Sequence, residues 1–178
     1  MKQKAITSVT LILAGNVLTT YNNIGSGWTS TITAIIGFII YFAGIGQLKP
    51  VLDEPGQNGL RLLKISAILG ITSLLLHLIP FLGAMIGGLL YLAAFVTQLF
   101  GLVQFKKTTA IGTIGAAGVN YLLMAMVLMI FGSIIGLMPF AGETIKAVFS
   151  FIAFILILWG WLKIQEGVVE AATSAPQT

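Results

Sequence analysis

The sequence predicts an all-α integral membrane protein with six transmembrane helices, arranged as three tandem parallel helical hairpin repeats. Hydrophobic residues make up 57% of the 178-residue chain and charged residues only 8%. A soluble domain is about a quarter charged, so this chain cannot cover itself with polar surface, and we expect its solvent to be lipid. An internal repeat with a period of about 57 to 59 residues predicts the hairpins.

The repeat is clearest between Leu78–Lys106 and Leu137–Gln165, which align with a shift of 59 residues. The matched positions include Pro80 and Pro139, Phe81 and Phe140, Phe95 and Phe154, and Gly101 and Gly160. A fainter copy lies 57 residues before the first stretch and places Gly44 opposite Gly101. Self-similarity at a fixed spacing indicates a repeated structural unit. We therefore expect one transmembrane domain, 1–178, with hairpins at 5–49, 60–106 and 110–165 and a flexible tail at 166–178.

Six apolar segments of roughly the 20 residues that cross a bilayer supply the helices. They cover residues 5–21, 28–49, 60–79, 84–105, 110–138 and 143–165. Turn signals separate them: the polar run 22–27, the loop Pro50–Gly59, Pro80, the turn Lys106–Thr109, and Pro139. Only the loop Pro50–Gly59 is long enough to form a substantial connection.

The first segment is the least apolar, because Thr7, Ser8, Thr10 and Asn16 interrupt it. Its basic start followed by an apolar run also resembles a signal peptide. No small-residue cleavage site follows, and no lipoprotein cysteine is present, so an uncleaved first helix is the preferred interpretation.

The distribution of basic residues predicts the orientation. Six crossings place eight of the nine basic residues on one side and only Lys146 on the other. The eight are Lys2, Lys4, Lys49, Arg61, Lys64, Lys106, Lys107 and Lys163. The positive-inside rule then puts both termini in the cytoplasm of a multi-pass plasma membrane protein, most simply in a bacterial inner membrane.

Small residues recur seven apart on the second helix of each hairpin and predict a helix-packing seam. These residues are Gly37, Gly44, Ala94, Gly101, Ala153 and Gly160. Small side chains let helix backbones approach closely, which is a main source of helix association in lipid. The first helices carry a second predicted match, in which the 57-residue shift pairs Asn16 with Ser73 and the 59-residue shift pairs Ser73 with Gly132.

Four polar residues are candidates for lining a cavity for a small solute: Asn16, His77, Gln98 and Asn120. Polar stripes of this kind also arise from ordinary helix packing, which is the simpler interpretation. His77 is the only histidine and has no neighbouring carboxylate or second ligand in the sequence, so it predicts neither a metal site nor a catalytic triad.

The chemistry of catalysis is not apparent in the sequence. The chain has no cysteine, and its Asp, Glu, Lys and Arg lie at or close to the ends of the expected helices, not in their central parts. Buried ionisable residues are the usual mark of proton relays and intramembrane catalysis. Gly112, Gly115 and Gly118 are spaced for helix packing and do not form a phosphate loop. We therefore expect no enzyme activity, no cofactor, no metal and no nucleic acid partner.

Two function classes remain. The first is a non-catalytic structural, assembly or accessory subunit that packs through small residues, with membrane lipid, further copies or other membrane-protein subunits as partners. The second is a channel or facilitator for a small neutral or lipid-like solute. A symmetric pore is disfavoured, because Gln98 corresponds to Tyr41 and Ile157 in the other copies.

Overall fold

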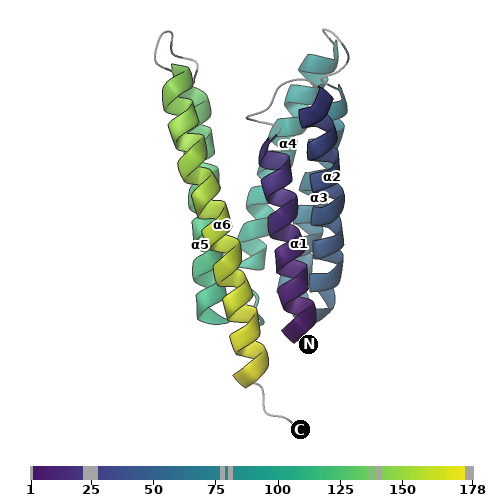
Figure 1. Cartoon of the computed structure of the whole chain (residues 1–178), viewed down its shortest axis with the longest axis vertical. Coiled ribbons are helices and arrows are strands. Elements are labelled where there is room, and N and C mark those ends of the chain that lie inside the picture. Colours follow the sequence, from purple (N-terminus) through teal and green to yellow (C-terminus); the bar gives the residue numbers. More distant parts are fainter. Residues whose placement is uncertain are drawn as a thin grey trace. The chain divides into compact units, whose positions relative to one another are not determined.

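The computed structural model describes residues 2–21, 28–76, 79, 82–136, 138 and 142–174. In this part of the chain every long element is an α-helix and there is no strand (Figure 1). The elements are α1 (Lys2–Tyr21), α2 (Trp28–Leu48), the short 3-10 helix η1 (Lys49–Val51), α3 (Glu54–Leu76), α4 (Leu82–Phe105), α5 (Gly112–Ile135) and α6 (Gly142–Ser174). The predicted turns at 22–27, Pro80 and Pro139 lie outside the described residues.

Five helices are long and apolar enough to cross a membrane, which makes the chain a multi-pass membrane protein. The candidate spans are Thr31–Val51, Glu54–Leu76, Met85–Phe105, Gly112–Ile135 and Gly142–Ala171. Helix α1 has the length of a span but not the apolar composition, because hydroxyl and amide side chains interrupt its hydrophobic run.

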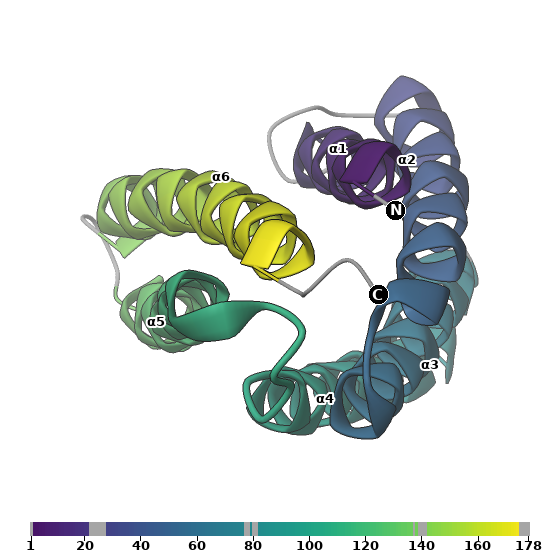
Figure 2. The same ribbon diagram turned by 90° about the horizontal axis from the view of Figure 1, so that it is seen from below.

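The chain forms two compact units, Met1–Ala110 and Ile111–Thr178. In the first unit α1 packs along α2 and α3 packs along α4, while α2 also touches α3 more sparingly. In the second unit α5 packs along α6. Figure 2 shows each of these pairs end on, with its two helices side by side. Each pair is consecutive in sequence, so each is a helical hairpin.

The connection between the first two hairpins is shorter than the loop Pro50–Gly59 that the sequence predicts. Helix α3 begins at Glu54, ahead of the predicted start at Leu60. Asp53 caps it, because the Gly56 amide donates to Asp53 Oδ1 over 3.2 Å. Pro55 suits the first turn, where an amide hydrogen has no helical acceptor. The first turn is thus helical but polar, and hydropathy alone assigns it to a loop.

Helix α6 continues to Ser174, whereas the sequence predicted its end at Gln165 and a flexible tail at 166–178. Gly167 lies against Ile111 and Gly115 at the start of α5, and Val168 is also buried, so the packing surface of the hairpin extends beyond the predicted end. Lys163 Nζ also pairs with Glu166 Oε2 at 2.6 Å along the exposed side. Residues 175–178 of the predicted tail lie outside the description.

The turn between α4 and α5 is short and joins the two units. Gly112 begins α5 with a positive φ of 59°, a conformation that side chains with a Cβ atom rarely adopt. Helix α5 then runs to Ile135, slightly short of the predicted Met138. The turn itself carries Thr108 and Thr109, which contact the start of α3, as described below.

Candidate functional site

All six residues of the predicted seam are buried, and each of the second helices turns its pair toward the first helix of the same hairpin. In the first hairpin Gly37 lies against Gly15: a methyl group added at Gly37 would sit 2.8 Å from the Gly15 carbonyl oxygen. Gly44 lies equally close to α1, with the Ser8 carbonyl oxygen 2.7 Å and the Ile12 nitrogen 2.8 Å from such a methyl group. These backbones therefore touch directly, as small residues permit.

The second hairpin combines the same close approach with hydrogen bonds. Ser66 on α3 donates through its Oγ to the Ala94 carbonyl oxygen over 2.8 Å. Ser73 donates in the same way to the Gly87 carbonyl oxygen over 2.8 Å. Gly101 packs on Leu63, whose nitrogen would be 3.1 Å from an added methyl group. Two hydroxyl groups thus tie α3 to the backbone of α4 inside the seam.

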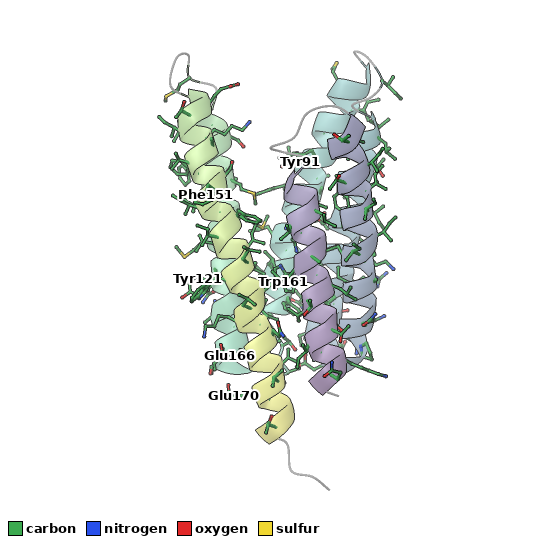
Figure 3. All side chains as sticks on the ribbon, viewed as in Figure 1. Tyr91, Tyr121, Phe151, Trp161, Glu166 and Glu170 are labelled. Carbon is green, nitrogen blue, oxygen red and sulfur yellow. The ribbon has the colours of Figure 1, made fainter. Side chains whose placement is uncertain are left out.

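The third hairpin relies on small residues alone at the corresponding positions. Ala153 is buried, and a methyl group at Gly160 would lie 2.8 Å from the Gly118 carbonyl oxygen. One at Gly118 would meet the Gly160 carbonyl oxygen at 2.5 Å and the Ile164 nitrogen at 2.9 Å. Trp161, labelled in Figure 3, is buried next to this crossing.

The contacts of the second and third hairpins correspond residue by residue. Gly59 lies against Phe105 in one and Gly118 against Ile164 in the other, and both members of the pair are shifted by 59 residues. The first hairpin differs in its first helix. Ile12 faces Gly44 in the first hairpin, and Leu63 faces Gly101 in the second. The two glycines are 57 residues apart in the sequence, but Ile12 and Leu63 are only 51 residues apart. Helix α1 is therefore shifted along α2 relative to the way α3 packs on α4.

This offset changes the predicted match on the first helices. The 57-residue shift pairs Asn16 with Ser73 and would put Ile6 in the position of Leu63, but the contacts place Ile12 there. Asn16 and Ser73 therefore occupy different levels of their hairpins. The pairing of Ser73 with Gly132 agrees with the contacts. Ser73 donates to the Gly87 carbonyl oxygen, and a methyl group added at Gly132 would lie 3.7 Å from the Lys146 carbonyl oxygen. Gly87 and Lys146 are also related by the 59-residue shift.

Asp53 forms a polar clamp that sequence reasoning missed. Its carboxylate accepts hydrogen bonds from the Thr109 amide and hydroxyl, both over 2.8 Å, and from the Thr108 hydroxyl, in addition to the Gly56 amide. Partial desolvation raises the pKa of this carboxyl, but the four hydrogen bonds outweigh it, so the net pKa lies below the ordinary value of 3.8. The clamp fastens the start of α3 to the turn after α4.

One signal in the sequence points to part of this clamp. An aspartate followed by Glu54 and Pro55 is a typical start of a helix, with the aspartate at the N-cap. Nothing in the sequence indicates that Thr108 and Thr109, more than fifty residues later, supply the remaining donors. That part of the site depends on the hairpin register.

The four predicted cavity residues are distributed over the fold. Asn16 is half-buried on α1, and its Nδ2 donates to the Ile12 carbonyl oxygen over 3.0 Å. Gln98 is half-buried on α4 in the second hairpin, and Asn120 is exposed on α5 in the other unit. His77 lies outside the described residues. The cavity stays a prediction.

Within the described ranges, every buried side-chain nitrogen and oxygen has a hydrogen-bond partner. The same ranges hold no group of three His, Cys, Asp or Glu side chains able to bind a metal ion. Comparison with protein-family models, with curated proteins and with solved structures finds no match for the chain.

Proposed function

We propose that the chain is a non-catalytic membrane protein that acts as a structural, assembly or accessory subunit. In this proposal it is built from three membrane-spanning hairpins that are copies of one unit. The observation that carries this proposal is the use made of the buried polar groups. Ser66 and Ser73 both donate to the backbone of the facing helix, at the seam where small residues meet. Hydroxyl groups used in this way hold helices together in lipid.

Helix α1 supplies the sixth span in this proposal. Its polar side chains bond to its own backbone: Thr10 donates to the Ile6 carbonyl oxygen over 2.9 Å and Thr19 to the Asn16 carbonyl oxygen over 2.9 Å. A hydroxyl that is satisfied within its helix loses much less on entering hydrocarbon than a free one. The buried face of α1, with Val9 and Ile12, packs along α2, which is itself a candidate span.

The outer faces of α4 and α6 support an assembly role. Both carry large exposed apolar residues at positions related by the 59-residue shift. These pairs are Leu89 and Val148, Leu92 and Phe151, and Phe100 and Trp159. Leu89 is 69% exposed and Phe151, labelled in Figure 3, is 65% exposed. Such faces suit contact with lipid and with transmembrane helices of further copies.

The oligomeric state of the purified chain tests this proposal. In a mild detergent, we expect light scattering after size-exclusion chromatography to give a homo-oligomer. Replacing Leu89, Leu92 and Phe100 together by alanine removes large contact residues without touching the seam, and should shift the population to monomers. Gln98→Leu, on the same helix, is the matched control and should leave the oligomer intact.

A monomer in both variants and in the unchanged chain contradicts the subunit role. If the monomer instead conducts a small neutral solute across liposome membranes, and Asn120→Leu abolishes the flux, the channel or facilitator is the better assignment. Asn120 is exposed on α5, so this substitution does not disturb the seam of the third hairpin.

A further inference from the structure

The charged residues of the first unit all lie at one end of its helices. The hairpins are antiparallel, as the contact of Gly44 with Ser8 and that of Gly56 with Thr108 show. The start of α1, the end of α2, the start of α3 and the end of α4 therefore meet at one end, the lower end in Figure 1. No charged residue of the unit lies outside 2–4, 49–64 and 106–107.

Six exposed cations form a basic rim at this end. They are Lys4, Lys49, Arg61, Lys64, Lys106 and Lys107. The ion pair that the structure describes joins Lys163 to Glu166 in the other unit, and none of the described ion pairs involves a member of the rim. Two carboxylates lie in the same region, Asp53 and Glu54.

The Asp53 carboxylate keeps its charge, but its described partners are neutral groups and not the cations of the rim. Both of its oxygens accept hydrogen bonds from the uncharged donors of Gly56, Thr108 and Thr109. Neutral donors of the turn that follows α4 thus bind Asp53, while Lys106 and Lys107 remain exposed. Only Glu54 is an exposed carboxylate, against six exposed cations.

Most cations of the rim lie near the ends of the candidate spans, which is the depth of lipid headgroups in a bilayer that these spans cross. The candidate spans of α2 and α4 end at Val51 and Phe105, close to Lys49, Lys106 and Lys107, and the span of α3 begins at Glu54, with Arg61 about two turns farther along. Lys64 lies about three turns inside α3, and its Nζ is 6.0 Å from the centre of the Phe42 ring on α2. This cation–π contact stabilises the exposed Lys64 ammonium group beside apolar surface.

We propose that the basic rim binds the phosphodiester headgroups of anionic phospholipids in preference to zwitterionic ones. Several cations at headgroup depth attract anionic lipid, and each one adds to the attraction. The rim thus selects the lipids that surround one end of the first unit. This inference goes beyond the proposed subunit role and needs only that the first unit be embedded in a bilayer.

Electron spin resonance of spin-labelled lipids tests the proposal with the full chain reconstituted in vesicles. The vesicles contain phosphatidylcholine, and the probe is spin-labelled phosphatidylglycerol or spin-labelled phosphatidylcholine at equal amounts. At low salt we expect the protein-bound fraction to favour the phosphatidylglycerol probe roughly threefold, and this preference should fall toward one in about 1 M NaCl. An equal bound fraction for the two probes at low salt overturns the proposal.

Substitution assigns the preference to the rim. Replacing Lys49, Arg61, Lys64, Lys106 and Lys107 by glutamine should remove most of the preference, whereas the same four lysines replaced by arginine should retain it. Lys146→Gln, a cation in the other unit, is the matched control and should have no effect. Retention of the full preference in the glutamine variant overturns the assignment.

Substitutions to glutamine at helix ends also alter the insertion of the chain into the bilayer. The salt titration of the unsubstituted protein is therefore an independent test of the proposal. If inorganic phosphate erases the preference at constant ionic strength, the site takes free phosphate and the lipid assignment is wrong. If the purified protein is monomeric in detergent, the subunit role is contradicted, but the proposed lipid preference is unaffected.

Discussion

The hairpin α3–α4 and the hairpin α5–α6 bring their helices together at corresponding positions, yet different chemistry holds each of them. Gly59 and Gly118 make the same backbone contact in the two hairpins. Around that contact, the second hairpin places Ser66 and Ser73 where the third has Ala125 and Gly132.

The ends of the two hairpins differ in the same sense. Thr108 in the second hairpin corresponds to Gly167 in the third. Thr108 bonds to Asp53, whereas Gly167 lies directly against the Ile111 carbonyl oxygen, with no room for a Cβ atom. The two hairpins have the same register, but hydrogen bonds between the helices stabilise the second, whereas direct packing of backbone on backbone stabilises the third.

The largest effect should come from the glycine contact that both hairpins share. A methyl group at Gly118 would lie 2.5 Å from the Gly160 carbonyl oxygen, and one at Gly59 would lie 2.6 Å from the Phe105 nitrogen. Because the opposing atoms are backbone, Gly118→Ala and Gly59→Ala should each destabilise the fold by about 3 kcal/mol. Thermal unfolding in detergent, followed by tryptophan fluorescence, measures this loss.

Gly46 and Gly88 supply the controls for these substitutions. Neither has any atom within 4 Å of an added methyl group. Gly46→Ala and Gly88→Ala should therefore leave the midpoint of thermal unfolding unchanged or raise it, because alanine has a higher helix propensity than glycine. Equal losses at all four positions would show that the seam is not where the helices meet.

The Asp53 clamp distinguishes the second hairpin and should give the next largest effect. Asp53→Ala removes the cap of α3 and both threonine contacts, so we expect a loss of about 2 kcal/mol. Glu54→Ala is the matched control, since Glu54 is exposed and contributes at most about 0.5 kcal/mol through the helix dipole. A loss at Glu54 as large as at Asp53 would refute the clamp.

The clamp should also respond to pH. The folded pKa of Asp53 lies below its ordinary value of 3.8, so its stabilisation is present above that value and is lost as the pH falls toward the folded pKa. The difference in unfolding midpoint between the unchanged chain and Asp53→Ala should be constant above about pH 5 and shrink in more acidic buffer. A difference that grows on acidification would contradict the direction of the pKa shift.

The hydroxyl groups of the seam should give the smallest effect. Ser66→Ala removes the bond to the Ala94 carbonyl oxygen and should cost about 0.6 kcal/mol, the average for a hydrogen bond between transmembrane helices. Ala125→Ser places the same group in the third hairpin, where it should add stability of similar size. Denaturation of the two variants side by side measures whether hydroxyl and methyl groups are interchangeable in this seam.

The sequence predicts the helices well because hydropathy and turn signals are local. The apolar runs place α2, α4 and α5 to within a few residues. Hydropathy fails where a helix is polar, as in the first turn of α3 at Glu54 and in α6 beyond Gln165. In both places helix capping or packing, not apolar composition, sets the boundary.

The seam and the clamp differ in how far the sequence reveals them. Glycine and alanine spaced seven apart indicate a packed helix face, and these residues are buried in the structure. The identity of the facing residues depends on the register of each hairpin. For α1 the 57-residue shift gives the wrong register, because Ile12 occupies the position of Leu63. Asp53 reaches Thr108 only after that register is set, so no local pattern shows the contact.

Labelling of single cysteines from the two sides of the membrane tests the central claim most directly. The chain has no cysteine, so Gln3→Cys, Lys107→Cys, Met138→Cys and Thr173→Cys each report one exposed position. Three spanning hairpins predict that a membrane-impermeant maleimide reaches Met138→Cys in intact cells and reaches the other three only after permeabilisation. Labelling of Gln3→Cys from the outside, together with Thr173→Cys from the inside, would mean five crossings and would contradict the account.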